Sequence, residues 1–119
     1  DLAITQLFFD AQDYLRFTKK AQLAGVHIPL IPGIMPMTSL RRVERMGELS
    51  GLAVPKRVRS ALAAATTPEE EYETGMELTA QLARDIVAGG ASGLHIYTHN
   101  NPDNTHDLLT RIGVDNDQR

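Results

Sequence analysis

A strand–helix–strand pattern in the first 31 residues is the feature that most limits the fold. Two short apolar segments, residues 3–9 and 26–31, are rich in residues that favour an extended backbone. Between them lies a predicted helix, with Asp10 suited to cap its start and Gly25 its end. Such a βαβ unit predicts two parallel strands joined by a right-handed crossover.

Four more helices and one more strand are predicted in the rest of the chain. Thr38 or Ser39 can cap a helix that ends near Gly51, a short helix follows it, and Thr67 begins a long one. The third strand covers residues 93–98 and the last helix follows it. Apolar spacing predicts which residues the first two helices bury: Tyr14, Phe17, Ala21 and Ala24 in the first, and Leu40, Val43, Met46 or Gly47, and Leu49 in the second.

Gln6 is an amide in the middle of the first predicted strand. Alternate residues of a strand share a face, so Gln6 is expected between Ile4 and Phe8, with Leu7 on the other face. A buried amide without partners costs about 1–3 kcal/mol. Gln6 is therefore either satisfied by another polar group of the core or reaches a ligand at the mouth of a sheet or barrel.

The composition is compatible with one packed domain and argues against several classes of protein. The 119 residues are 42% hydrophobic and carry a net charge of −3, which argues against nucleic acid as a partner. No cysteine is present, so disulfides and thiolate metal sites are excluded. No apolar run approaches 18 residues and no signal-peptide pattern is seen, so no membrane partner is expected and the cytoplasm is the default location.

Two local groups of basic residues depart from this acidic balance. They are either charges on the outer faces of two short helices or a site for an anionic ligand such as a polyglutamate tail. The groups are Arg41, Arg42 and Arg45, and Lys56, Arg57 and Arg59.

The histidines and carboxylates predict no metal site. His95 and His99 share a face of the third predicted strand but lie about 13 Å apart by strand rise. His106 could approach His99, yet no carboxylate has ligand spacing. His99 is thus either a polar group lining a pocket or a solvated side chain at the strand end. The run Glu69–Glu71 is explained by the start of a helix.

Four segments in order resemble the methylenetetrahydrofolate reductase family. They are residues 3–10 (AITQLFFD), 14–17 (YLRF), 31–36 (IPGIMP) and 95–100 (HIYTHN). The resemblance spans residues 1–114 and implies the C-terminal part of a (β/α)8 barrel that binds FAD. Residues 115–119 are polar and form a tail after it. The chain would then supply about three strand–helix units, with extra helices after the second strand. A complete barrel needs about 250 residues.

The resemblance also implies roles for single residues, and several positions depart from the family pattern. Gln6 matches a glutamine that hydrogen-bonds the folate pterin and can contact the nicotinamide. Where the family has a glutamine, this chain has Arg42, and where the family has a stacking aromatic, it has Met46. The family's arginine after the last strand is replaced by Asn101. We infer that Arg42 supplies the cation that Asn101 does not. His99 stays a candidate for the pocket lining, with the solvated strand end as its alternative. No catalytic acid is expected in this segment.

The implied reaction reduces methylenetetrahydrofolate to methyltetrahydrofolate with NADH or NADPH as the reductant and FAD as the cofactor, in one-carbon and methionine metabolism. The segment alone is expected to be inactive, since most FAD contacts would lie outside it. Alternatives are a non-catalytic folate-binding or supporting subunit and, less well supported, an FAD barrel of the proline dehydrogenase kind.

An isolated piece of barrel also has consequences for assembly. It would leave strand edges unpaired and expose the inner face of Ile4, Phe8 and Leu30. We therefore expect pairing with the rest of the barrel or with a second copy, as a homo-oligomer.

Overall fold

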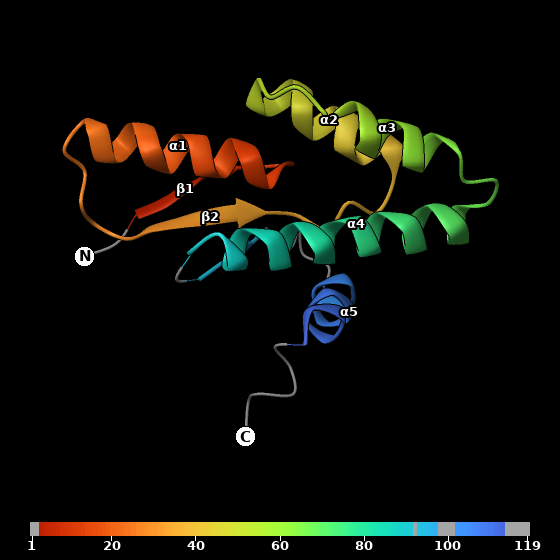
Figure 1. Ribbon diagram of the computed structural model, residues 1–119. Coiled ribbons are helices and arrows are strands. Elements are labelled where there is room, and N and C mark those ends of the chain that lie inside the picture. Colours follow the sequence, from red (N-terminus) through yellow and green to blue (C-terminus); the bar gives the residue numbers. More distant parts are fainter. Residues whose placement is uncertain (1–2, 92, 98–101, 114–119) are drawn as a thin grey trace.

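Three parallel strands form the centre of the fold, with helices packed around them (Figure 1). The computed structural model describes residues 3–91, 93–97 and 102–113, without the side chains of residues 3–6 and 102. The strand order is β1 (Ala3–Leu7), β2 (Leu30–Ile34) and β3 (His95–Ile96), with β2 in the middle. Both pairings are parallel, which confirms the predicted βαβ unit.

The first strand does not follow the strict alternation that its sequence predicts. Its pairing with β2 shifts register between Ile4 and Leu7, and the strand ends at Leu7 instead of residue 9. Leu7, Phe8 and Phe9 are consequently all buried. The ring of Phe8 meets Tyr14 edge-on with centroids 5.6 Å apart, so the expectation that the chain alone exposes Phe8 is wrong.

The second strand was predicted at residues 26–31 and instead spans Leu30–Ile34. Residues 26–29 are exposed, and the strand runs through Pro32 and Gly33. The Gly33 carbonyl accepts a hydrogen bond from the N–H of Phe8, the residue just after β1, so the neighbouring Pro32 faces β3. Pairing with β3 begins only at Gly33, opposite His95. A central strand therefore tolerates the missing proline donor here.

Helix α1 (Ala11–Leu23) begins and ends where local capping signals predict. The Asp10 carboxylate accepts a hydrogen bond from the Gln12 N–H, and Gly25 adopts a φ of 90° just after the helix. The predicted apolar stripe is only partly correct. Tyr14 is buried, but Phe17 is 36% exposed and Ala24 lies beyond the helix.

Helices α2 and α4 also start at their predicted caps. Ser39 caps α2 (Leu40–Ser50), which ends at a left-handed Gly51, and Thr67 caps α4 (Pro68–Ala88). Between them lies α3 (Lys56–Ala63), and α5 (Pro102–Ile112) follows β3. Val43 is buried as expected, whereas Leu49 is 68% exposed.

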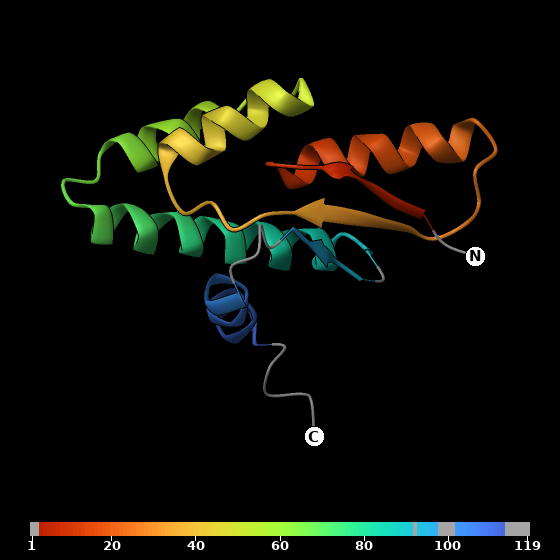
Figure 2. The same ribbon diagram turned by 180° about the vertical axis from the view of Figure 1, so that it is seen from behind.

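Helix α4 is the element against which most of the other helices pack. It contacts α1, α3 and α5, and both views show α5 beside it on the side away from α1 (Figures 1 and 2). Its buried residues are Gly75, Met76, Thr79, Ala80, Leu82, Ala83 and Ile86. The helix therefore supplies much of the mostly aliphatic core.

The architecture is a mixed α/β fold with a short parallel sheet and five helices in the part of the chain described. The element order β-α-β-α-α-α-β-α is the predicted one, and it is compatible with a piece of a (β/α) barrel. None of the described helices is long and apolar enough to cross a membrane.

Candidate ligand site at the carboxyl ends of the strands

The carboxyl ends of the three parallel strands meet at one edge of the sheet, where barrels of this kind bind ligands. Backbone hydrogen bonds continue beyond the strands at this edge. The Phe8 N–H donates to the Gly33 carbonyl, and the Tyr97 N–H donates to the Ile34 carbonyl, both over 2.9 Å. The segments after β1, β2 and β3 are thus held together as one edge.

Tyr97 lies directly after β3, and its ring covers Gly33 of the neighbouring strand. A Cβ atom placed on Gly33 would lie 2.5 Å from the Tyr97 ring, so this position needs the bare backbone of glycine. The ring of His95 meets Tyr97 edge-on with centroids 4.6 Å apart. Sequence reasoning missed Tyr97. The available signal was an aromatic at a strand end beside a strand glycine.

Two of the predicted site residues lie on α2. Arg42 is exposed and Met46 is partly buried against the core, one helical turn apart as predicted. The helix is held at its start, where the Ser39 hydroxyl accepts from the Arg42 N–H and the Glu71 carboxylate of α4 accepts from the Leu40 N–H over 2.8 Å.

The outer face of α2 carries a surface hollow of about 730 Å³. Three arginines and two glutamates line it, so its charge is mixed, with one net positive charge. Its lining comprises Ser39, Arg41, Arg42, Glu44, Arg45, Met46, Glu48 and Leu49. The second basic group, on α3, is exposed, and its Arg59 pairs with Glu44 at 3.2 Å.

The remaining predicted residues are placed less fully. Gln6 lies on β1, but its side chain is outside the described part of the structure, and His99 and Asn101 lie outside the described residues altogether. Among the predicted residues, the structure therefore brings together Arg42 and Met46 and leaves the positions of the other three side chains as predictions.

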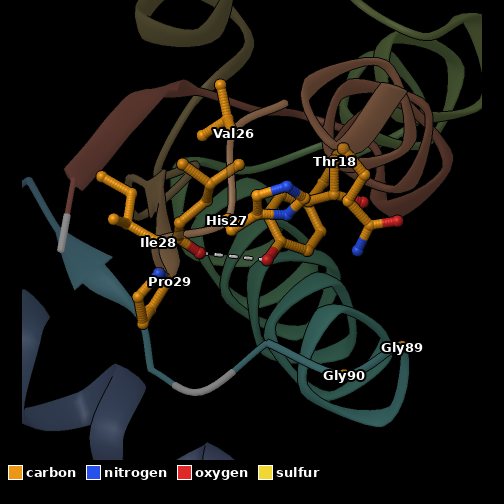
Figure 3. A pocket seen from close by; sticks show the side chains of 10 residues that line it. Thr18, Val26, His27, Ile28, Pro29, Gly89 and Gly90 are labelled. Atoms are coloured by element: carbon orange, nitrogen blue, oxygen red, sulfur yellow. Dashed lines mark hydrogen bonds between the residues drawn. The ribbon is translucent and has the colours of Figure 1, made fainter. Parts of the chain in front are cut away.

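A second pocket, of about 420 Å³, lies at the opposite end of β2 (Figure 3). It is bounded by residues 26–30 and by Gly89 and Gly90 after α4. The Tyr14 hydroxyl donates a hydrogen bond to the Leu30 carbonyl over 3.1 Å beside it. Since it lies at the amino end of the strand, this pocket is not at the edge where barrels bind ligands.

Arg111 joins three carboxylates between α4 and α5. It donates to Asp107, Glu73 and Glu77, each over 2.8 Å. The Arg111 hydrogen bond holds the pKa of Asp107 below its usual value. Burial, and then the hydrogen bond that Tyr72 donates to Asp107, raise the pKa of Tyr72 to about 12. In the described part of the structure, no set of three His, Asp or Glu side chains lies close enough together to hold a metal ion.

Comparison with known proteins matches residues 1–113 to the family model described as Methylenetetrahydrofolate reductase. Methylenetetrahydrofolate reductase 1 of Schizosaccharomyces pombe is 30% identical over 96% of this chain and 19% of its own length. A probable methylenetetrahydrofolate reductase (NADH) of Oryza sativa is 31% identical, with the same coverage. The Escherichia coli 5,10-methylenetetrahydrofolate reductase is 28% identical over 94% of this chain and 38% of its own length. The chain thus spans well under half the length of these relatives.

Proposed function

The chain belongs to the methylenetetrahydrofolate reductase family, and from this premise we propose that it is part of an oxidoreductase that reduces methylenetetrahydrofolate to methyltetrahydrofolate. The match over residues 1–113 carries the proposal. The reductant would be NADH or NADPH, since relatives named for each are similar to this chain. FAD would be the cofactor. The reaction would belong to one-carbon and methionine metabolism, and the protein would act in the cytoplasm as a homo-oligomer.

In this proposal the segment binds and orients folate. The Gln6 amide, on a strand that ends at the carboxyl edge, would pair with the pterin through its adjacent donor and acceptor. Met46 would pack against a flat part of the ligand, and Arg42 would face its carboxylates. Tyr97 adds an aromatic surface at the same edge. His99 and Asn101 stay proposed members of the pocket.

The start of α2, the helix that carries Arg42 and Met46, does not fit the pyrophosphate of FAD. A pyrophosphate needs free backbone N–H groups at a helix start or in a glycine-rich loop. At the start of α2, the Leu40 N–H is already bound to a carboxylate of Glu71, which would also repel an anion. We propose that the main FAD contacts and the catalytic acid lie in parts of the full-length protein outside this chain, as the resemblance to the family implies.

A second candidate is a non-catalytic folate-binding or supporting subunit. The departures from the family pattern at Arg42, Met46 and Asn101 favour it. Folate reduction by the full-length protein would decide for the enzyme, and folate binding without reduction would decide for the subunit.

Substituting Gln6→Glu in the full-length protein tests the folate role. Losing one oriented hydrogen bond should lower kcat/KM for methylenetetrahydrofolate by about 10- to 100-fold. The matched control is Gln12→Glu, the same change at an exposed position of α1, which should leave the kinetics unchanged. Unchanged folate kinetics in the Gln6 variant would refute its assignment.

Substituting Arg42→Ala tests whether this cation meets the glutamate part of folate. Salt screens charge attraction, so the loss of folate affinity should be larger at low than at high ionic strength. Arg16→Ala, which removes an exposed arginine of α1 outside the hollow and outside both basic groups, is the control. An equal loss of folate affinity at both salt concentrations, or no loss, would show that Arg42 is a solvated surface residue and does not contact folate.

A further inference from the structure

Thr79 is the only polar side chain that is fully buried in the described part of the structure. It lies in the middle of α4, and both hydrogen-bonding functions of its hydroxyl are used. The hydroxyl accepts from the Met37 N–H over 2.9 Å and donates to the Gly75 carbonyl over 2.7 Å. A valine would fill the same space but leave the Met37 N–H buried without an acceptor.

Gly75, one turn before Thr79 on α4, packs against the backbone of Met37 as well. A Cβ atom on Gly75 would lie 1.6 Å from the Met37 carbonyl oxygen, so only a bare helix backbone lets this loop lie against α4. One turn earlier, the Glu71 carboxylate accepts from the Leu40 N–H. Glu71, Gly75 and Thr79 are spaced four apart and form one stripe of α4.

This stripe holds the segment from Met37 to Leu40, which joins the carboxyl end of β2 to the start of α2 (Figure 1). Met37 itself is 1% exposed. Because α2 begins at Leu40, the placement of the loop sets the placement of Arg42 and Met46, the two predicted folate residues of α2. A buried hydroxyl on one helix is thereby linked to residues on another helix.

We propose that Thr79 is a positioning residue for folate, acting through the Met37–Leu40 loop on Arg42 and Met46; this rests on the proposed function. A hydrogen bond to a backbone N–H fixes the loop more narrowly than apolar packing, which is not directional. Loss of the hydrogen bond between Thr79 and Met37 should therefore weaken folate binding more than it slows reduction of the protein by NADH or NADPH.

The test uses three variants of the full-length protein. Thr79→Val removes the hydroxyl at constant shape, Thr79→Ser keeps it, and Thr18→Val removes a hydroxyl that bonds only within α1. Thr79→Ala carries the test if the valine variant does not fold. The readouts are amide hydrogen exchange at Met37, KM for methylenetetrahydrofolate, and the rate at which NADH or NADPH reduces the protein.

The valine variant should raise the exchange rate at Met37 and raise KM for folate by about three- to tenfold, with reduction by the nicotinamide within about twofold. The serine and Thr18 variants should stay within about twofold of wild type. Unchanged exchange at Met37, unchanged folate KM, or an equal effect on both substrates would each overturn the inference. A wild-type protein that reduces no folate would refute the proposed function instead, whatever Thr79 does.

Discussion

At the scale of single residues, Arg111 joins the two helices at the C-terminal end of the described chain. Its side chain is only 16% exposed, and its contacts reach Glu73 and Glu77 on α4 and Asp107 on its own helix. Asp107 in turn accepts the hydrogen bond of Tyr72 from α4. Because the phenol and the carboxylate share this contact, the contact between α4 and α5 should depend on pH.

The Tyr72 pKa is raised from 10.0 to about 12 in the fold, so folding favours the neutral phenol. This stabilisation is fully present below pH 10 and is lost as the pH rises towards 12. We expect the free energy of unfolding to fall by about 1–2 kcal/mol across this interval. This is less than the full pKa shift implies, because solvent screens a partly exposed group. Unfolding of the full-length protein, measured between pH 10 and 12, would show it.

Tyr72→Phe is the control, because it keeps the ring and removes the titrating group. The variant should lose less stability than wild type over the same alkaline interval. At the acid end, Asp107 has a lowered pKa, so its contribution is present above pH 3.8 and falls as the pH drops below it. If the stability of wild type and of the Tyr72→Phe variant fell identically between pH 10 and 12, the proposed role of Tyr72 would be contradicted.

At the scale of elements, the contact between α4 and the loop after β2 depends on very close backbone approach. Gly75 lies in a helix interior, where glycine is less favourable than alanine by about 1 kcal/mol. Its presence there is explained by the Met37 carbonyl, which leaves no room for a side chain. The loop and α4 are therefore packed as one unit.

Gly75→Ala should destabilise the full-length protein by about 1–3 kcal/mol despite the gain in helix propensity, because the loop must move away from α4. Gly93→Ala is a suitable control, since its Cβ would meet only the Ile31 side chain at 3.6 Å. The control should change stability by at most about 0.5 kcal/mol. Equal free energies of unfolding for the two variants would show that the contact is not as tight as described.

At the scale of the whole molecule, the sheet is narrow and its outer edges are open in the described part. The outer sides of β1 and β3 have no partner strand there. Large apolar side chains also lie on the surface, with Leu23 81% and Leu49 68% exposed. Unpaired strand edges beside apolar surface favour association.

The 119-residue polypeptide on its own should therefore not persist as a compact monomer. We expect it to assemble through its strand edges, to pair with the rest of a barrel when that is supplied, or to aggregate. Its mass in solution, measured by analytical ultracentrifugation, checks this. A stable monomer with a cooperative thermal transition would contradict the barrel interpretation.

The helix starts, and the placement of Arg42 and Met46 one turn apart on α2, could be predicted from sequence because they depend on short-range contacts. Asp10, Ser39 and Thr67 each cap a helix through a backbone N–H two or three residues away. Arg42 and Met46 are neighbours because they lie four apart on one helix. Family motifs spread along the chain likewise identify it without a structure.

Strand bounds and the contacts between segments depended on partners far away in the chain. The second strand was misplaced because Pro32 and Gly33 disfavour strands, and only the positions of β1 and β3 make them acceptable. Thr79 and Met37 are 42 residues apart, and no local pattern predicts that a helix hydroxyl will accept from that N–H. Such contacts form only when packing has set the distance between elements, and so the tertiary structure decided them.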